Sequence, residues 1–377
     1  MPKRIPRNLL ALAAIGLALT SPVRAHDNDP VIHFPDLPDL LTLVCDFHQH
    51  TVFSDGAVWP DIRVKEGIRD GLDVMAVTDH LEYQPHRDDI PHPDRNRSFD
   101  LALAAAKEAD ILVVRGAEVT RRMPPGHINA IFLQDVNRLI QDDPLTVMRE
   151  AVVQGGFLFW NHPAWTSQVR DGVSRLTDMH RQMIEEGLLH GIEVINEDTY
   201  SESALQIALD HNLVIMGTSD IHGLIAWDYE KYPHTHRPVT LVFAEDRTAE
   251  AVRTALMDRR TVVWYADTLI GREAWMQTLL HASLSLEIDG YDESNDLLAF
   301  ELTNHSDAPL TLRNAGIFSL YNSGDVLVVP PHETRELNLI TKGRVEQVNF
   351  AFEVLNALTA PRTHPVMRWE NLDTLNP

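Results

Sequence analysis

The hydrophobic pattern over the larger part of the chain alternates between short apolar runs and longer segments with helix signals. Short apolar runs bounded by turn residues are typical of buried strands, and a proline or serine before an amphipathic stretch is typical of a helix start. Strands are expected at residues 43–45, 73–77, 111–114, 128–133, 157–160, 191–196 and 213–217, the last of the series. Helices are expected to begin at Pro60, Ser98, Pro144 and Ser201. This repeated order predicts a parallel α/β fold, and seven strands with polar residues at their ends suggest a barrel.

The pattern changes at about residue 281, where apolar and polar residues begin to alternate one by one. Alternation of this kind is typical of half-buried strands, and turns rich in Asp, Asn, Gly and Pro separate the segments. The sequence therefore predicts an all-β sandwich over residues 281–377. The α/β barrel is expected over residues 43–280, after an extended lead-in at residues 26–42.

The first 25 residues have the pattern of an export signal. Basic residues come first, an uncharged apolar run covers residues 9–19, and residues 23–25 fit a small-residue cleavage site. The apolar run is too short to span a bilayer, and no other segment is apolar and long enough to do so. We therefore expect a periplasmic or secreted protein whose signal peptide is cleaved; a hydrophobic first helix of the fold is the alternative. The single cysteine, Cys45, excludes an internal disulfide and is expected to be buried.

The acidic composition limits the kinds of partner that the protein can bind. The formal net charge is -23 and the pI is about 5.1, which argues against a nucleic acid as the main partner because its phosphates need a surplus of Lys and Arg. An anionic substrate would need local positive charge, and bound metal ions would supply it.

Residues able to bind metals stand at the ends of the expected strands, most of them just after a strand's C-terminal end. They are His48, His50, Asp55, His80, Glu118, His127, His162, Asp220 and His222. His48 and His50 are two positions apart, so on an extended chain both imidazoles point to the same side. Imidazole and carboxylate groups without thiolates favour Zn, Mn or Fe in a reactive site over a structural zinc site.

Several short motifs together resemble the PHP (polymerase and histidinol phosphatase) superfamily. They are His-x-His and Ser-Asp-Gly within residues 48–56, Thr-Asp-His at 78–80, the lone Glu118, Gly-His at 126–127, Asn-His-Pro at 161–163 and Ser-Asp-x-His at 219–222. The resemblance covers roughly residues 43–265. It implies a distorted seven-stranded (β/α) barrel with two or three divalent metal ions at its C-terminal face.

The resemblance also implies how the ligands are shared. A first ion would be held by His48, His50, Glu118 and Asp220; a second by the bridging Glu118 with His127 and His162; a third by Asp55, His80 and His222. Asp55 stands where some family members have a histidine, so the third site of the expected trinuclear centre differs from theirs in one ligand. Asp79 is expected to orient a ligand histidine.

A carboxylate shared by two ions fits hydrolysis of a phosphate ester. The two ions would lie about 3.5–4 Å apart and generate a bridging hydroxide that attacks phosphorus, while a third ion stabilises the leaving oxygen. Glu118, Asp220, His222 and Asp79 are therefore the expected catalytic group. Arg121, Arg122, His234 and His236 are candidate phosphate ligands, with ordinary loop ion pairs as the alternative. Trp59, Trp165, Trp227 and Tyr229 are near ligand segments and could line an apolar pocket or pack in the core.

The function expected from these observations is that of an exported, metal-dependent phosphodiesterase acting on a small-molecule phosphate ester. The export signal, the C-terminal β domain and residues 264–271 are similar to the secreted phosphodiesterase branch of the family. A phosphomonoesterase of the histidinol-phosphatase type is the close alternative. An amidohydrolase-like barrel usually carries a strand-borne lysine between its metals, and no lysine stands at a strand end here. A non-catalytic scaffold would lack ligands, and none is missing. The sequence leaves the oligomeric state open.

Overall fold

The computed structural model describes residues 31–229, 236–291 and 296–374. The expected export signal, residues 1–25, lies outside the described residues, so export stays a prediction. None of the helices in the described ranges combines the length and the apolar character that crossing a membrane requires.

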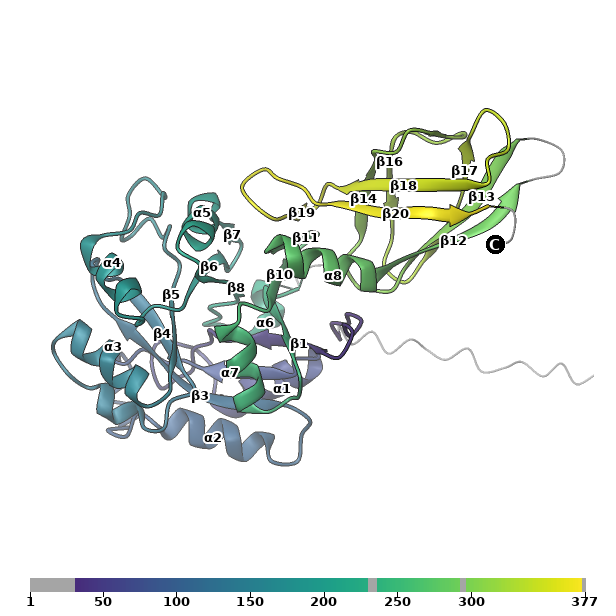
Figure 1. The fold of residues 1–377 in the computed structure, drawn as a ribbon. Helices are drawn as coiled ribbons and strands as arrows, with labels where there is room; N and C mark the ends of the chain where they lie inside the picture. The colour runs from purple at the N-terminus through teal and green to yellow at the C-terminus, as the bar shows by residue number, and fades with distance from the viewer. Residues whose placement is uncertain (1–30, 230–235, 292–295, 375–377) are drawn as a thin grey trace, which may run out of the picture.

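The larger domain is built from strands and helices in near-regular alternation (Figure 1). Its elements are β1 (Leu41–Asp46), α1 (Pro60–Arg69), β2 (Val74–Val77), α2 (Arg97–Ala106), β3 (Leu112–Thr120), β4 (His127–Ile131), a 3-10 helix (Val136–Leu139), α3 (Pro144–Val153), β5 (Phe157–Trp160), α4 (Asp178–Glu185), β6 (Gly191–Asn196), β7 (Thr199–Tyr200), α5 (Glu202–Asp210), β8 (Val214–Thr218), α6 (Ile225–Asp228), β9 (Val239–Ala244), α7 (Ala249–Met257), β10 (Thr261–Tyr265), β11 (Thr268–Gly271) and α8 (Glu273–Ser283).

Local sequence signals explain most of the helix starts. Pro60 and Pro144 occupy the first turn of α1 and α3, where the missing N–H of proline has no helical partner to lose. The side chain of Ser201 caps α5 by accepting from the backbone N–H of Ala204. These three starts are confirmed, whereas α2 begins one residue before Ser98, which lies in its first turn and is not its cap.

The large sheet is mixed, which corrects the expectation of parallel strands. Strands β1, β2 and β3 are parallel, but β4 is antiparallel to both β3 and β5. The chain between β3 and β4 covers only residues 121–126, too few for the helical crossover that a parallel pair needs. The series also does not end at β8, because β9, β10 and β11 extend the sheet beyond β1 with antiparallel pairing.

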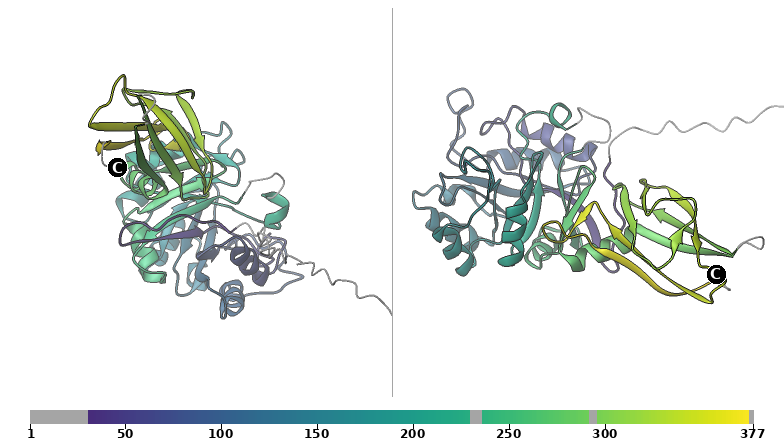
Figure 2. Two further views of the ribbon diagram at one scale, coloured as in Figure 1. Left: turned by 90° about the vertical axis from the view of Figure 1, so that its right-hand side faces the viewer. Right: turned by 90° about the horizontal axis from the view of Figure 1, so that it is seen from above.

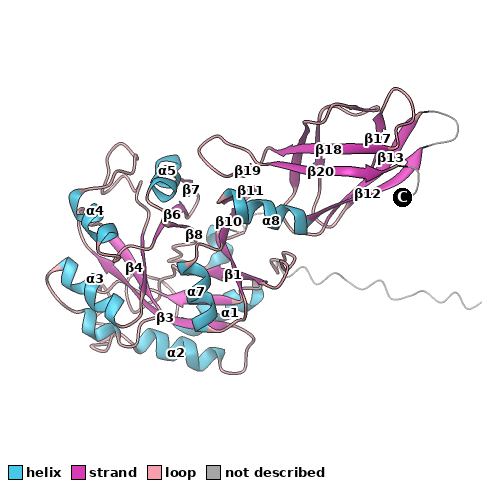
Figure 3. Ribbon diagram, in the orientation of Figure 1, coloured by secondary structure: helices cyan, strands magenta, loops and turns pink. Residues whose placement is uncertain are grey.

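The large sheet curls, and this brings β8 close to β9 and β10. The backbone N–H of Gly217 donates to Oγ1 of Thr240 on β9, and that hydroxyl donates to the carbonyl of Gly217. A Cβ at Gly217 would lie 2.2 Å from Cγ1 of Val263 on β10, so the close approach requires glycine. No backbone ladder joins β8 to β9 or β10 among the described strands, and the closed seven-stranded barrel is not confirmed in that form. Figure 3 shows the helices around the outside of this curled sheet.

The all-β sandwich is confirmed in the C-terminal part. Its strands are β12 (Leu284–Tyr291), β13 (Leu297–Asn304), β14 (Leu310–Asn314), β15 (Ser319–Leu320), β16 (Val326–Val329), β17 (Thr334–Ile340), β18 (Gln347–Val354) and β20 (Val366–Asp373). They form two antiparallel four-stranded sheets. Phe300 and Phe350 meet between the sheets with ring centroids 4.6 Å apart. Two further views show the sandwich as a separate body beside the larger domain (Figure 2).

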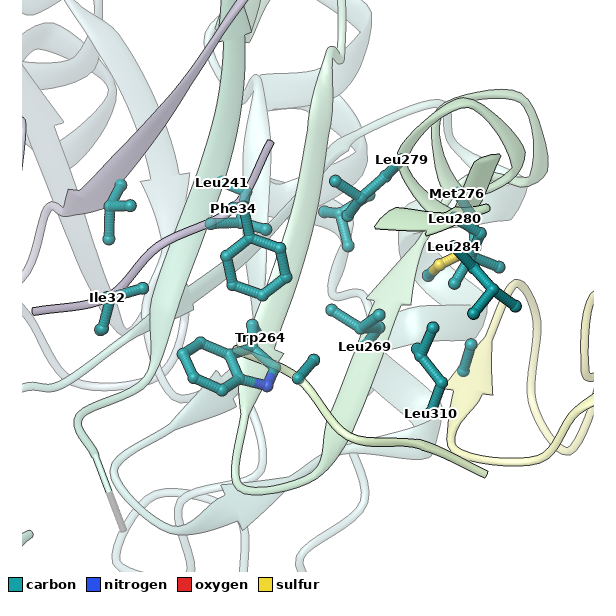
Figure 4. Packing of buried hydrophobic residues seen from close by; sticks show 14 of the residues in the cluster. Ile32, Phe34, Leu241, Trp264, Leu269, Met276, Leu279, Leu280, Leu284 and Leu310 are labelled. Carbon is teal, nitrogen blue, oxygen red and sulfur yellow. The ribbon is translucent and has the colours of Figure 1, made fainter. Parts of the chain in front are cut away.

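One hydrophobic cluster continues from the larger domain into the sandwich. Figure 4 shows Trp264 and Leu269 of the large sheet, Met276 of α8, and Leu284 and Leu310 of the sandwich within one buried group. The short strand β19 (Ala357–Leu358), which follows β18, leaves the sandwich and pairs with β11 in the large sheet. The two domains therefore share both a core and a sheet edge, which favours a fixed arrangement.

Candidate metal centre

The candidate centre lies at one edge of the curled sheet. His48 and His50 follow β1, His80 follows β2, His162 follows β5, and Asp220 follows β8. Glu118 lies within β3, and His127 is the first residue of the antiparallel β4. Because β4 runs against its neighbours, its beginning meets the same edge at which the parallel strands end. Residues from distant parts of the sequence thus reach one place.

Asp220 lies between the two histidines of the His-x-His motif. Its Oδ1 atom is 3.0 Å from Nε2 of His48 and 3.0 Å from Nε2 of His50. The two Nε2 atoms are themselves 3.1 Å apart. Both imidazoles are fully buried, and the spacing of two residues does place them on the same side, as the sequence predicted.

Glu118 stands in the middle of the cluster, and its two oxygens face different histidines. Oε1 lies 2.7 Å from Nδ1 of His127 and 3.5 Å from Nε2 of His162. Oε2 lies 2.5 Å from Nδ1 of His80 and 3.5 Å from Nε2 of His50. The carboxylate is fully buried and so links two halves of the cluster.

Asp55 completes the cluster on the side nearer the solvent. Its Oδ1 atom lies 3.3 Å from Nε2 of His222, 3.4 Å from Nε2 of His80 and 3.8 Å from Nδ1 of His50. With these contacts, all nine residues selected from the sequence meet in one cluster. Eight of them fall into overlapping sets whose ligand atoms lie within 4.8 Å of one another, and His162 joins through its contacts with Glu118 and Asp220.

Unusual backbone conformations orient the side chains of two cluster residues. His162 and Asp220 have φ angles of 29° and 49°, in the left-handed region that residues other than glycine rarely adopt. Such conformations gather at functional sites, where the surrounding structure holds them. Gly56 has a different role: a Cβ there would lie 2.6 Å from the carbonyl carbon of His50, so the turn after His50 can close only on glycine.

Asp79 fixes the loop that follows His50. Its carboxylate accepts hydrogen bonds from the backbone N–H of Thr51 at 2.7 Å, from the Thr51 hydroxyl at 2.8 Å and from the Ser54 hydroxyl at 2.8 Å. Ser54 Oγ lies in turn 3.4 Å from Nδ1 of His50. Asp79 thus acts on the loop, and reaches the histidine only through Ser54.

Glu193 is a member of the site that the sequence analysis missed. Its Oε1 atom lies 2.8 Å from Nδ1 of His48 and accepts from the Thr218 hydroxyl at 2.6 Å. Its Oε2 atom accepts from the backbone N–H of His162 at 2.6 Å. The available signal was a single carboxylate inside the otherwise apolar run of β6. A carboxylate bonded to the outer nitrogen of a histidine is the usual partner of a metal-binding imidazole.

Asn161 and Arg63 also support the cluster. The amide of Asn161 donates to Oε1 of Glu118 at 3.1 Å. The guanidinium of Arg63 is fully buried and donates to the carbonyls of His50 and His222, both at 2.9 Å. These bonds hold the backbone of two segments that carry cluster histidines.

The electrostatics of the cluster favour positive charge at its centre. Burial alone raises the pKa of Glu118, but the charge of His80 and bonds from His127 and other histidines outweigh it and hold that pKa well below its usual range. Burial lowers the pKa of His80, but Glu118 and Asp55 raise it to about 10 overall. His50 is the exception, because burial and the neighbouring His80 and His222 lower its pKa to about 4 despite Asp220.

Buried atoms without hydrogen-bond partners test whether the residues suit a cation. Oδ1 of Asp55, Oε2 of Glu118, Nδ1 of His127 and Oδ1 of Asp220 make no well-aligned hydrogen bond within the described residues, although each lies close to a charged or ionisable group of the cluster. A buried polar atom without a partner is destabilising by about 1–3 kcal/mol. Divalent cations would satisfy these atoms, and nitrogen and oxygen ligands of this kind suit Zn, Mn or Fe. The residues therefore fit divalent metal ions.

Two of the four expected phosphate ligands, Arg121 and His236, make contacts away from the cluster. Arg121 pairs with Glu82 at 2.8 Å and donates to the carbonyl of Gln141, so it makes the loop ion pair considered as the alternative. Arg122 is exposed. The ring of His236 stacks on Trp264 with centroids 3.6 Å apart, and its Nδ1 bonds to the carbonyl of Arg237. His234 lies outside the described residues.

Of the four aromatic residues expected near the site, Trp165 lines a pocket. Its ring centroid is 5.2 Å from that of His162 and 5.6 Å from that of His127. The pocket beside it has a volume of about 140 Å³. Tyr229 is buried and donates its hydroxyl to the carbonyl of Ser219, so it packs in the core. Trp59 and Trp227 are 43% and 66% exposed and do not line this pocket.

Comparison with known proteins gives a strong match over both domains. A crystal structure from Bacteroides vulgatus, described as a two-domain protein containing a predicted PHP-like metal-dependent phosphoesterase, is 40% identical in sequence. The match covers 90% of this chain and 98% of that chain, with a TM-score of 0.85. A family model described as an Ig-like domain matches residues 284–370. No curated protein matches the chain.

Two more distant structures also match. A candidate metal-dependent phosphoesterase from Bifidobacterium adolescentis is 20% identical over 56% of this chain and 95% of its own, with a TM-score of 0.41. An amidohydrolase from Chromobacterium violaceum is 16% identical over 48% of this chain and 87% of its own, with a TM-score of 0.34. At these scores neither likeness bears on the function.

Proposed function

The chain belongs to the PHP-like metal-dependent phosphoesterases, and from this premise we propose that it is a phosphodiesterase acting on small organic phosphate esters. The observation that carries the proposal is the position of Glu118, whose two oxygens face separate groups of histidines. A carboxylate in this position suits two cations side by side, the arrangement used in phosphate ester hydrolysis.

Three groups of residues would hold the ions. They are His48, His50 and Asp220; His127 and His162; and Asp55, His80 and His222, with Glu118 shared between groups. Divalent ions bound there would supply positive charge for the phosphoryl oxygens and lower the pKa of a coordinated water towards neutrality. Three ions of the Mn, Zn or Fe type are our proposal for the number and kind.

The protein's own residues keep these ligands in position. Because Glu193 accepts a hydrogen bond from the N–H at Nδ1 of His48, the lone pair of Nε2 faces Asp220 and the centre. Asn161 directs one oxygen of Glu118 by donating to it, and Asp79 holds the loop after His50. Ligands fixed before the substrate arrives need no rearrangement during the reaction.

A diester is proposed over a monoester because of the pocket next to His162. A diester carries one negative charge and a second organic arm, and the pocket beside Trp165 offers room for such an arm. We also propose that the protein is exported, on the strength of the pattern in residues 1–25, which lie outside the described residues. The net charge of -23 supports a small-molecule substrate over a nucleic acid.

The proposal is tested with bis(p-nitrophenyl) phosphate and p-nitrophenyl phosphate after chelation and reloading with Mn²⁺, Zn²⁺ or Fe²⁺. The expected result is release of p-nitrophenol from both esters with the diester preferred, and no release after chelation. A preference for the monoester would reassign the protein as a phosphomonoesterase. Activity that survives complete chelation would contradict the metal-dependent mechanism.

A further inference from the structure

A pocket opens directly from the candidate metal centre, between the segment after β5 and the hairpin of β6 and β7. His162 of the centre is one of its walls, and Trp165, Asn196, Glu197 and Ser201 are others. We call this pocket the arm pocket and define it by Trp165, Asn196, Glu197 and Ser201. Its volume of about 140 Å³ is below the range of about 300–1,000 Å³ found for sites of drug-sized ligands. The space suits a small organic group attached to a phosphate held at the centre.

Apart from His162 of the centre, the ionisable side chains that line the arm pocket are the carboxylates of Glu193 and Glu197. Glu197 is an exposed residue of its lining, and its carboxylate has neither a hydrogen bond nor an ion pair within the described ranges. No lysine or arginine lines the pocket among the described residues. The φ angle of Glu197 is 50°, so its backbone is held in the left-handed region, which few residues other than glycine occupy. A carboxylate or a second phosphate in this space would lie near the carboxylate of Glu197, which has no ion-pair partner among the described residues.

Trp165 gives the arm pocket an aromatic wall. Its side chain is 45% exposed, although its ring contacts those of His127 and His162. An indole ring attracts cations through its π face and binds apolar groups by burying their surface. An aromatic ring and a carboxylate that line the same pocket are a combination that binds ammonium groups.

We propose that the arm pocket receives the organic arm of the ester and selects an ammonium-bearing arm over a neutral one, and a neutral arm over an anionic one. This inference rests on the proposed phosphoesterase function and adds a substrate class to it. The phosphate would be held at the centre whatever the arm, so Glu197 and Trp165 determine the preference between arms. Asn196 and Ser201 complete the walls, and the amide of Asn196 is held by its donations to Glu193 at 2.9 Å and Asp220 at 3.2 Å.

The test uses three p-nitrophenyl phosphodiesters that differ only in the second arm. The arms are choline, the uncharged 3,3-dimethylbutyl group of the same shape, and a 3-carboxypropyl group. For the wild-type protein we expect kcat/KM to be about tenfold higher for choline than for dimethylbutyl, from the combined effect of one carboxylate and one indole. The carboxypropyl ester should be the poorest substrate. Equal values for the three esters would overturn the proposal.

The variant Glu197→Gln removes the charge with little change of shape. It should bring the ratio of kcat/KM between choline and dimethylbutyl esters close to one and raise the relative rate of the carboxypropyl ester. Glu185→Gln, an equal charge change at an exposed position of α4, is the control and should leave both ratios as in the wild type. An unchanged choline preference in Glu197→Gln would show that Glu197 does not set it.

A binding measurement separates this inference from the proposed function. If no ester is cleaved with any metal, the proposed function fails. Calorimetric titration of the metal-loaded protein with phosphocholine and with 3,3-dimethylbutyl phosphate then decides the pocket's role. Tighter binding of phosphocholine that Glu197→Gln removes would support the arm pocket, and equal binding of the two would overturn it.

Discussion

Oε1 of Glu193 lies 2.8 Å from Nδ1 of His48, and both side chains are fully buried. The histidine therefore presents Nε2 to the cluster, and Glu193 decides which of its two nitrogens is available. A residue outside the nine candidate ligands can in this way control metal binding.

We predict that Glu193→Gln weakens metal binding about 10–100-fold while the fold remains. Glutamine has the same shape but loses the charge that favours a proton on Nδ1 of His48. The affinity is measured by competition with a chelator, with Glu185→Gln as the control for a charge change elsewhere. An affinity equal to that of the wild type would remove Glu193 from the centre's support.

We predict that Glu118→Gln abolishes turnover. An amide can offer only its oxygen to one ion, so the link between the two halves of the cluster is lost. Activity is measured with the p-nitrophenyl esters, and thermal unfolding of chelated protein checks that the variant folds. Near-normal activity would contradict a bridging role for Glu118.

Chelation should lower the melting temperature, and reloading with a divalent metal should restore it. The buried oxygens of Asp55, Glu118 and Asp220 that lack hydrogen-bond partners would be satisfied by the ion only in the folded state. Thermal unfolding by circular dichroism with increasing Mn²⁺ gives the measurement. In Glu118→Gln the shift should be smaller than in the wild type, and a metal-independent melting temperature would argue against these ligands.

His180 should make the protein less stable in acid. Burial lowers its pKa from 6.5 to about 4, although its bond to the carbonyl of Pro125 opposes the shift. Between these values the unfolded chain binds a proton at His180 that the folded chain does not. The contribution of this group to the free energy of unfolding is therefore fully present above pH 6.5 and is lost as the pH falls to about 4. The loss from this group is about 3 kcal/mol.

Urea unfolding of chelated wild type and His180→Gln between pH 7 and pH 4 isolates this effect, because both proteins share every other titrating group. The difference in unfolding free energy between the two proteins should change across that range. Parallel pH curves would assign the acid sensitivity to other residues.

The two domains should unfold together. Leu310 of the sandwich is fully buried in the cluster that also contains Leu269 of the large sheet (Figure 4). Leu310→Ala should therefore destabilise the whole chain by about 2–5 kcal/mol in a single transition. Val328→Ala, at a position 47% exposed, is the control and should have little effect. Two separate transitions in the wild type would show that the shared cluster does not couple the domains.

The sequence by itself determined the residues of the cluster, because the spacing and the residue types within short motifs fix their local geometry and chemistry. A spacing of two placed His48 and His50 on one side of an extended chain, and polar residues at successive strand ends had to meet at one sheet edge. The alternating pattern after residue 281 likewise sufficed for the sandwich, since one face of each strand is buried.

Tertiary structure alone decided which groups serve these ligands and which do not. Glu193 lies in a strand buried on both faces, so no alternation of residues could show that its carboxylate meets His48. Arg121 forms an ion pair with Glu82 instead of facing the cluster. Glu82 stands 39 positions earlier, and no spacing rule connects the two residues. The arm pocket exists only because the turn after β5 meets the hairpin of β6 and β7, and contacts between distant segments depend on how the sheet curls.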